Sequence, residues 1–367
     1  MKEKLTCSYC GAELTEATAH HFDGVTMCED CLDNQTVICD NCGDRIWRNN
    51  SEGDRYVTLC ISCFENQYTV CEECGRLVHN DEAFSVEDSD YYYCQDCYNR
   101  LKNRAIKSYY YKPDPIFYGS GSLYMGVELE IDKGGEDNSN AEKLLDIANR
   151  VEEKIYCKHD GSLHDGFEMV SHPMTLEYHK NEMNWKEIFD KAIEMDYRSH
   201  NTSTCGLHIH VNRSAFGDSF YEQEEKIARV VHFVELHWNE FLKFSRRTED
   251  SMNHWASRYG IMTTAKETYD NAKKKHTGRY VAVNLENVNT IEFRLFRGSL
   301  RYETFISVLQ LVYEICRFAI MLSDKELENM SWSEFVLKID KNKTELIEYL
   351  KSKQLYVNEI TSESEEM

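Results

Sequence analysis

The sequence is short of proline, of basic residues and of long apolar segments. It has 3 prolines in 367 residues, and 42 Lys and Arg against 64 Asp and Glu give a formal net charge of −22. No run approaches the roughly 18 apolar residues of a membrane span, so we do not expect a transmembrane protein. The acidic balance argues against general nucleic-acid binding and against anionic membranes. The opening segment MKEKLTCSYC lacks the apolar part of a signal peptide, and we expect a cytoplasmic protein.

The glycine motifs that commonly bind phosphates are also missing. The chain has no GxxxxGK[ST] and no GxGxxG after a strand-like segment. Any bound polyphosphate would therefore have to be held by arginines and metal ions. A hydrophobic content of 41% is still enough for a real core, and the length favours two or three domains.

Cysteine, in contrast, is abundant and regularly spaced. Twelve of the 15 cysteines form six CxxC pairs, which repeat from positions 7, 39 and 71 with a period of 32 residues. The pairs are Cys7/Cys10 with Cys28/Cys31, Cys39/Cys42 with Cys60/Cys63, and Cys71/Cys74 with Cys94/Cys97. Without a secretion signal, this usage indicates metal binding rather than disulfides. Four thiolates per repeat match tetrahedral Zn²⁺ and resemble treble-clef or LIM-like modules.

A zinc ion held by four thiolates has no position left for a substrate. We therefore expect three structural zinc ions that fold segments too small to bury a core. His20, His21 and His79 could replace a thiolate, but surface histidines are the simpler interpretation. The modules are expected to dock a partner or a peptide or protein substrate, with a RING-like adaptor role as the alternative.

The rest of the chain has a different pattern. We predict zinc modules over 1–105, a linker over 106–122 that holds two of the three prolines, a larger domain over 123–325, and a helical extension over 326–367 with a disordered acidic tail. Amphipathic helices are predicted at 141–154, 177–195, 220–244 and 304–322. Because strands interleave with these helices, the predicted class is α+β with a mainly antiparallel sheet.

Five predicted strands alternate apolar and polar residues, which places the polar side chains on one face. These polar residues are Glu128 and Glu130 in 126–131, Glu168 in 166–173, His208 and His210 in 206–212, Arg279 in 278–287, and Glu292 and Arg294 in 290–300. Each pattern alone is also typical of a solvated sheet face. Together, such carboxylates repel one another unless cations lie among them, and the ligand types favour Mg²⁺ or Mn²⁺. Arginines beside such metals commonly bind a transferring phosphoryl group, so we expect an ATP site.

The order of the motifs GVELE, HDGSL…FEMVSHP, CGLHIHV, RYVAVNL and TIEFRLFRGSL resembles the amidoligase family over roughly 123–322. These ATP-dependent carboxylate–amine ligases are related to glutamine synthetase and glutamate–cysteine ligase. The resemblance implies a glutamine-synthetase-like antiparallel sheet, curved into a partial barrel, with packed helices. It implies Mg²⁺ ligands at Glu128, Glu130, Glu168, His208 and Glu292, a nucleotide-side role for His210, and phosphate-binding arginines at Arg279, Arg294 and Arg297.

The implied reaction joins a carboxylate to an amine through an acyl phosphate. Asp160, in KHDGSL, is the candidate base for the amine, although an Asp-Gly turn without a catalytic part is an equal alternative. Three rival functions are a guanidino-kinase-like phosphotransferase, a non-catalytic adaptor with a decayed ligase body, and a zinc hydrolase using His208 and His210. Cys205 could be a nucleophile, but a buried free thiol is the commoner case.

Overall fold

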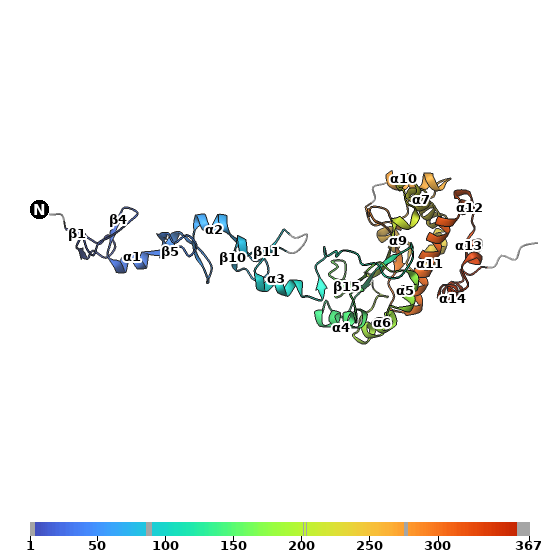
Figure 1. Ribbon diagram of the computed structural model, residues 1–367, viewed down its shortest axis with the longest axis horizontal. Helices are drawn as coiled ribbons and strands as arrows, with labels where there is room; N and C mark the ends of the chain where they lie inside the picture. Colours follow the sequence, from blue (N-terminus) through green and yellow to red (C-terminus); the bar gives the residue numbers. More distant parts are fainter. Residues whose placement is uncertain (1–3, 86–89, 201, 203, 275–277, 358–367) are drawn as a thin grey trace, which may run out of the picture. The chain divides into compact units, whose positions relative to one another are not determined.

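The structure is a computed structural model that describes residues 4–85, 90–200, 202, 204–274 and 278–357. The chain separates into two compact units, Met1–Arg104 and Ala105–Met367 (Figure 1). The acidic tail that the sequence predicts to be disordered lies outside the described residues.

The first unit repeats one small pattern three times. In each repeat, short antiparallel strands flank the first CxxC pair, and a helix begins directly after the first cysteine of the second pair. The strands are β1 Leu5–Thr6, β2 Glu13–Leu14, β3 His20–Phe22, β4 Val25–Met27, β5 Thr36–Ile38, β6 Arg45–Trp47, β7 Ser51–Gly53, β8 Thr58–Cys60, β9 Tyr68–Val70, β10 Leu77–His79, β11 Phe84–Ser85 and β12 Tyr92–Tyr93. The helices are α1 Glu29–Gln35, α2 Ile61–Gln67 and α3 Gln95–Lys102, with 3-10 turns η1 Arg48–Asn50 and η2 Asn80–Glu82.

The second unit is built on a seven-stranded sheet in the order β13-β15-β16-β14-β17-β19-β18. The strands are β13 Ile106–Lys107, β14 Met125–Ile131, β15 Ile155–Lys158, β16 Phe167–Ser171, β17 Gly206–Asn212, β18 Val283–Asn284 and β19 Thr290–Arg297. Every neighbouring pair is antiparallel except β13 and β15. The predicted α+β class with a mainly antiparallel sheet is therefore confirmed. Among the described strands the sheet is open, with β13 and β18 at its edges, and they form no closed barrel.

Helices from the whole length of the second unit pack around this sheet. They are α4 Asn138–Ala148, α5 Leu176–Asn181, α6 Trp185–Glu194, α7 Phe220–Leu236, α8 Trp238–Ser245, α9 Glu249–Trp255, α10 Ala265–Lys274, α11 Tyr302–Met321, α12 Asp324–Glu328, α13 Trp332–Lys338 and α14 Thr344–Ser352, with a 3-10 turn η3 Arg213–Phe216. α4 packs against α6 and β15, and α11 packs against α5, α7 and α14 (Figure 1).

Two helices predicted as continuous are each divided in two. The segment 177–195 forms α5 and α6, and the segment 220–244 forms α7 and α8, which meet at His237. The buried His237 side chain hydrogen-bonds to the Met330 carbonyl oxygen over 3.0 Å, which ties the break to a distant segment. Apolar periodicity reflects only the local sequence and does not reveal such a tertiary contact. The pattern therefore predicted one continuous helix.

The expectation that no segment approaches the length and apolar composition of a membrane span is wrong for α11. Among the described residues, it is the one helix long and apolar enough to cross a membrane, with a mean hydropathy of 1.5 over its best stretch. That stretch is 78% buried inside the protein. The central helix of a packed core needs the same apolar composition, and α11 belongs to the main core cluster together with residues of α7 and of the sheet.

Candidate functional site

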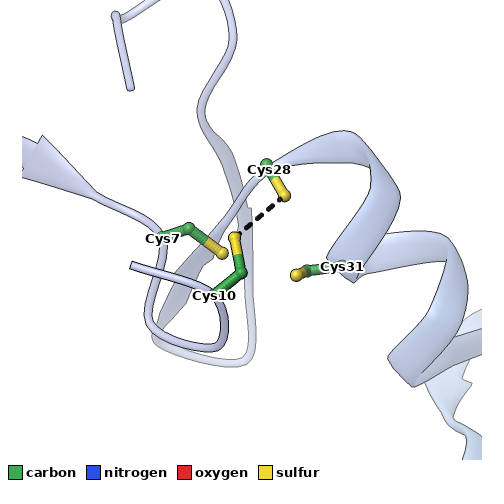
Figure 2. A group of neighbouring side chains, drawn as sticks. All are labelled: Cys7, Cys10, Cys28 and Cys31. Carbon is green, nitrogen blue, oxygen red and sulfur yellow. Dashed lines mark hydrogen bonds between the residues drawn. The ribbon is translucent and has the colours of Figure 1, made fainter. Parts of the chain in front are cut away.

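Each repeat of the first unit gathers four cysteine side chains. In every group the sulfur atoms lie within 4.8 Å of one another, and each group consists of the four cysteines predicted for that repeat. Figure 2 shows Cys7 and Cys10 on a turn facing Cys28 and Cys31 at the start of α1, with the Cys10 and Cys28 sulfurs 3.7 Å apart. This donor set is that of a closed, structural zinc site. The three histidines considered as alternative ligands belong to none of these groups.

The turn in each group is set by a glycine. In the first repeat the Gly11 N–H donates to the Cys7 carbonyl oxygen over 2.9 Å, and Gly11 has a φ of 76°, which favours glycine. Backbone N–H groups, those of Cys10 and Cys28 first, lower the pKa of Cys7 to about 6. They favour the thiolate at Cys7, which is the form that binds a metal. In the same turn, the Ala12 N–H is outweighed by the Cys7 and Cys28 side chains, which raise the pKa of Cys10.

In the second unit, the sheet register aligns the polar residues predicted from the strands. On β14, Glu130 pairs with Glu168 of β16, and Glu128 pairs with His208 of β17. His210 of β17 then pairs with Glu292 of β19. Because directly paired residues in a sheet point to the same face, these residues of four adjacent strands share one surface.

Two overlapping groups on this surface could hold a metal ion. They are Glu128, His210 and Glu292, and Glu128, Glu168 and His208, with ligand atoms within 4.8 Å of one another in each group. Glu128 joins both groups. Its Oε1 lies 3.2 Å from His210 Nε2, and its Oε2 lies 3.4 Å from His208 Nδ1.

The site is buried, which strengthens the interactions between its charged groups. Glu168, Glu292 and His208 are 2%, 3% and 6% exposed. Burial and the neighbouring Glu128 carboxylate raise the pKa of Glu168 well above its ordinary value. Burial alone would raise the pKa of Glu128. The charges and hydrogen bonds of His210 and His208 have the larger effect and hold this pKa well below its ordinary range. A bound cation would relieve this repulsion among carboxylates.

The donor set fits a hard divalent cation. Carboxylate oxygens dominate, as Mg²⁺ and Mn²⁺ prefer, and imidazole nitrogens complete the set. His210 Nε2 is buried 3.2 Å from Glu128 Oε1, and the two residues belong to one group that could hold a metal ion. No thiolate enters either group, which separates this surface chemically from the zinc sites.

Arg294 pairs with a carboxylate of this surface, and β19 bulges beside it. Leu207 pairs with Phe296 while Ile209 pairs with Phe293, so β19 carries one extra residue opposite His208. A bulge of this kind redirects the side chains beside it. The Arg294 guanidinium pairs with Glu292, and its Nε atom is buried without a hydrogen-bond partner among the described residues.

Three other predicted site residues, Arg279, Asp160 and Glu130, belong to neither of these two groups. Arg279 is exposed and donates to the Tyr109 hydroxyl over 2.8 Å, and the Tyr280 ring lies beneath both Arg279 and Arg294. Asp160 accepts hydrogen bonds from Ser162 N and Oγ at 2.7 and 2.5 Å, and its charge helps to raise the pKa of Glu168. The Glu130 carboxylate accepts from the Gly206 N–H.

The sequence patterns did not identify Arg247, which adds a second guanidinium. It follows α8 and the capping residue Arg246, which has a left-handed φ of 62°. Burial lowers the pKa of Arg247 to about 10, the nearby Glu130 charge opposes that shift, and its Nε atom has no hydrogen-bond partner among the described residues. Arg297 lies close enough to Arg247 to contribute to the lowering. A loop position of this kind leaves no periodic signal in the sequence.

Gly206 is closely surrounded by His208, Arg247 and Glu130, which leave no room for a side chain. A Cβ atom at Gly206 would lie 2.8 Å from His208 Nε2, 2.9 Å from Arg247 Nη2 and 3.4 Å from Glu130 Oε2. Any other residue here would therefore displace one or more of these three groups. Lys158 and Asn284 were also missed, and they contact Glu168 over 3.2 Å and Glu292 over 2.8 Å.

Comparison with known proteins supports the resemblance stated from the motifs. Residues 146–316, a little under half of the chain, match a protein family described as "Putative amidoligase enzyme". This match confirms the resemblance to the amidoligase family over these residues. The match includes β16, β17 and β19 with their polar residues, whereas β14, with Glu128 and Glu130, precedes it. No curated protein matches the chain.

Proposed function

Because the second unit carries an amidoligase domain over residues 146–316, we propose that this protein is an ATP-dependent ligase that joins a carboxylate to an amine. The observation that carries the proposal is the polar surface of β14, β16, β17 and β19. There, buried carboxylates and imidazoles lie beside a guanidinium whose donors are not all used. Metal-bound nucleotide phosphates need this combination of acidic ligands and cationic side chains.

Glu128, Glu168, His208 and Glu292 would hold divalent cations, with Glu130 beside them. When bound, Mg²⁺ or Mn²⁺ would neutralise the terminal phosphates of ATP, which lets an anionic carboxylate approach them. The chain's own part is to fix these ligands in advance. Lys158 and Asn284 do so by contacting Glu168 and Glu292 from the neighbouring strands.

Arg294 and Arg247 would bind the phosphoryl group during its transfer. In the first step, a substrate carboxylate oxygen attacks the γ-phosphorus, the bond to the bridging oxygen of ADP breaks, and an acyl phosphate forms. The negative charge then spreads over phosphoryl oxygens. Both arginines retain an Nε–H without a partner among the described residues, so each has a donor for these oxygens.

In the second step, the amine attacks the acyl carbon and inorganic phosphate leaves, which gives the amide. The attacking nitrogen must lose a proton, and we assign Asp160 as the acceptor. Both Ser162 hydrogen bonds go to Asp160 Oδ1, and Oδ2 makes no hydrogen bond among the described residues. This arrangement orients the carboxylate and leaves one oxygen available to the amine.

We assign the zinc modules to recruitment of a peptide or protein substrate. Their cysteine groups are closed by four thiolates, which leaves no open position for chemistry. A unit of about 100 residues with no catalytic metal is more than a small metabolite requires, whereas it suits a large substrate that must be held near the site.

The test measures ADP release with ATP and Mg²⁺ against pools of carboxylates, amines and peptides, followed by the mass of the product. Replacing Glu292 by Gln should lower the rate about 10²- to 10³-fold, because a preorganised charge is lost. Glu286→Gln is the matched control, since Glu286 is exposed and lies six positions earlier. An E292Q rate equal to wild type would remove the role of Glu292.

The same assay separates the rival functions. A ligase yields ADP, phosphate and an amide, whereas a phosphotransferase leaves the phosphate on its acceptor. A non-catalytic adaptor would bind no nucleotide in the presence of Mg²⁺, and a zinc hydrolase would act without ATP.

A further inference from the structure

The first unit contains two equivalent junctions between consecutive zinc modules. The first junction consists of the end of α1 with the hairpin β5–β6, and the second of the end of α2 with the hairpin β9–β10. The period of 32 residues relates them position by position. Differences between the two junctions can therefore be read as substitutions in one local structure.

Two arginines fill the first junction. Arg45 lies 3.5 Å from Asp33 and donates to the Thr36 hydroxyl over 2.7 Å. Arg48 donates to the carbonyl oxygens of Asn34, Asp33 and Thr36 at 3.0, 2.9 and 3.3 Å. This local structure thus binds guanidinium groups through one acidic side chain and the carbonyl oxygens at the end of the helix.

The second junction lacks both arginines. By the 32-residue period, Leu77 replaces Arg45 and Asn80 replaces Arg48, while Glu65 retains the acid of Asp33. Asn80 keeps the contact to the helix end, donating to the Asn66 carbonyl oxygen over 3.2 Å. The exposed Glu65 carboxylate has no ion pair among the described residues. The acid is present here, but no described residue supplies a cation to it.

A groove of about 420 Å³ lies at the second junction, beside β9. Apolar and aromatic side chains line it, including Phe64, Tyr68 and Tyr92, together with the acids Glu65, Glu72 and Asp90. Val70, Tyr91 and Tyr92 are 52%, 57% and 49% exposed, which is high for such side chains. The Leu77 N–H donates to Asp54 over 2.9 Å, so the hairpin beside the groove is fixed to the preceding module.

We propose that this groove binds an extended segment of a partner protein that carries an arginine beside an apolar residue. The guanidinium takes the place at Glu65 that Arg45 takes at Asp33, and its aliphatic stem lies on Tyr68 and Tyr92. The inference deepens the proposed recruiting role of the zinc modules and depends on it. Tyrosine faces in this unit already accept guanidinium groups, since Arg55 lies 4.6 Å from the Tyr56 ring centroid.

Charge also favours an arginine-containing partner. Residues 1–100 hold 7 Lys and Arg against 20 Asp and Glu, a net charge of −13. A field of this sign attracts a basic segment and speeds its encounter with the groove. Arginine is preferred over lysine because its planar group can meet a carboxylate and stack on a ring at once.

The test uses the full zinc-loaded chain and a fluorescein-labelled peptide, Ala-Leu-Arg-Leu-Ala, followed by fluorescence anisotropy. Its matched twin replaces the arginine with citrulline, which keeps the shape and removes the charge. We expect the arginine peptide to bind about twofold to fivefold more tightly, as exposed charge pairs allow. Equal binding of the two peptides would overturn the proposal.

Variants of the chain locate the effect. Glu65→Gln with Glu72→Gln should abolish the preference for arginine over citrulline, whereas Glu16→Gln with Glu29→Gln removes the same charge elsewhere in the unit and should keep it. Leu77→Arg restores the residue of the first junction and should also abolish the preference, by supplying the chain's own guanidinium. Native mass spectrometry should show three zinc ions in every variant, which confirms folding. A preference unchanged in E65Q/E72Q would refute the site.

ADP release from small carboxylate and amine substrates separates this inference from the proposed ligase function. That rate should be the same in E65Q/E72Q as in wild type, because neither residue belongs to the sheet surface that is proposed to bind the nucleotide. A peptide preference without any ADP release would support the groove while refuting the ligase function. ADP release without a peptide preference would refute the groove and leave the ligase function in place.

Discussion

The two units of this protein fold for different physical reasons. In the second repeat the buried hydrophobic residues are Cys39, Leu59 and Cys63, and two of these three belong to the four-cysteine group that could hold a metal ion. The second unit has one continuous core that extends from the sheet through α7 and α11 to α14. We therefore expect the first unit to depend on metal binding for its stability, whereas the second unit depends on burial of apolar surface.

The units also differ in where they place charge. The acids at the second junction are exposed, and under our proposal a partner would bring the opposite charge to them. The acids of the sheet surface are buried, and their neighbours already shift their pKa values in opposite directions. Exposed charge suits reversible recognition, whereas buried and opposed charge is typical of sites that bind metals or catalyse reactions.

The largest expected effect is the loss of zinc. Chelation, or Cys39→Ser in one module, should unfold part of the first unit and leave the second unit folded, since structural zinc contributes about 10–16 kcal/mol in small domains. Native mass spectrometry should show three zinc ions in the untreated chain, and limited proteolysis should report which unit opens.

Cys316→Ala is the matched control for this experiment. Cys316 is buried in α11 of the second unit and belongs to none of the four-cysteine groups. Its replacement should leave the zinc count at three. If Cys39→Ser kept three zinc ions and the protease resistance of wild type, the metal-dependent account of the first unit would be wrong.

The next largest effect concerns the core of the second unit. Phe305 of α11 is fully buried, with its ring 4.9 Å from Trp185 and 5.1 Å from Phe189. Phe305→Ala should lower the free energy of unfolding of this unit by about 3–5 kcal/mol, because it leaves a cavity. Urea unfolding followed by tryptophan fluorescence would measure the change.

Met321→Ala, at the exposed end of the same helix, serves as the control. Met321 is 67% exposed, so its removal should change the free energy of unfolding by less than about 0.5 kcal/mol. Both variants should retain three zinc ions. A loss of zinc in F305A would show that the two units do not fold independently.

The parts of this structure that the sequence predicted rest on strict periodicity. The segment GLHIHVN alternates without interruption, and the strand β17 coincides with it at Gly206–Asn212. The cysteine spacing likewise predicted which four side chains meet in each module. In both cases a local pattern determines the geometry, and no distant residue has to be known.

The parts that the sequence did not predict depend on contacts between distant segments. Arg247 reaches the site from a loop, Asn284 belongs to a strand of two residues at the sheet edge, and the break at His237 follows a hydrogen bond to Met330. Strand β13 lies within the segment predicted as a linker. It pairs with β15, which is about 50 residues away in the sequence. None of these features leaves a repeating signal in its own neighbourhood.

The smallest expected effect is an acid sensitivity of the second unit that needs no metal. His179 of α5 is fully buried; its Nε2 donates to the Met125 carbonyl oxygen over 2.9 Å, and its Nδ1 accepts from Trp185 Nε1 over 3.3 Å. A neutral imidazole satisfies both contacts, whereas a proton on Nδ1 would face another donor. Burial lowers the pKa of His179 to about 4, although the Met125 carbonyl partly opposes the shift.

Because the folded pKa lies below the unfolded value of about 6.5, the unfolded chain binds more protons between these two values. Stability from this group is therefore complete above pH 6.5 and falls as the pH drops toward 4, by about 2 kcal/mol between pH 7 and pH 5. Urea unfolding of the second unit at the two pH values would measure the loss. His179→Gln should remove this share of the pH dependence, while the exposed His254→Gln should keep it. If H179Q and wild type lost the same stability on acidification, the acid sensitivity of this unit would have to come from groups other than His179.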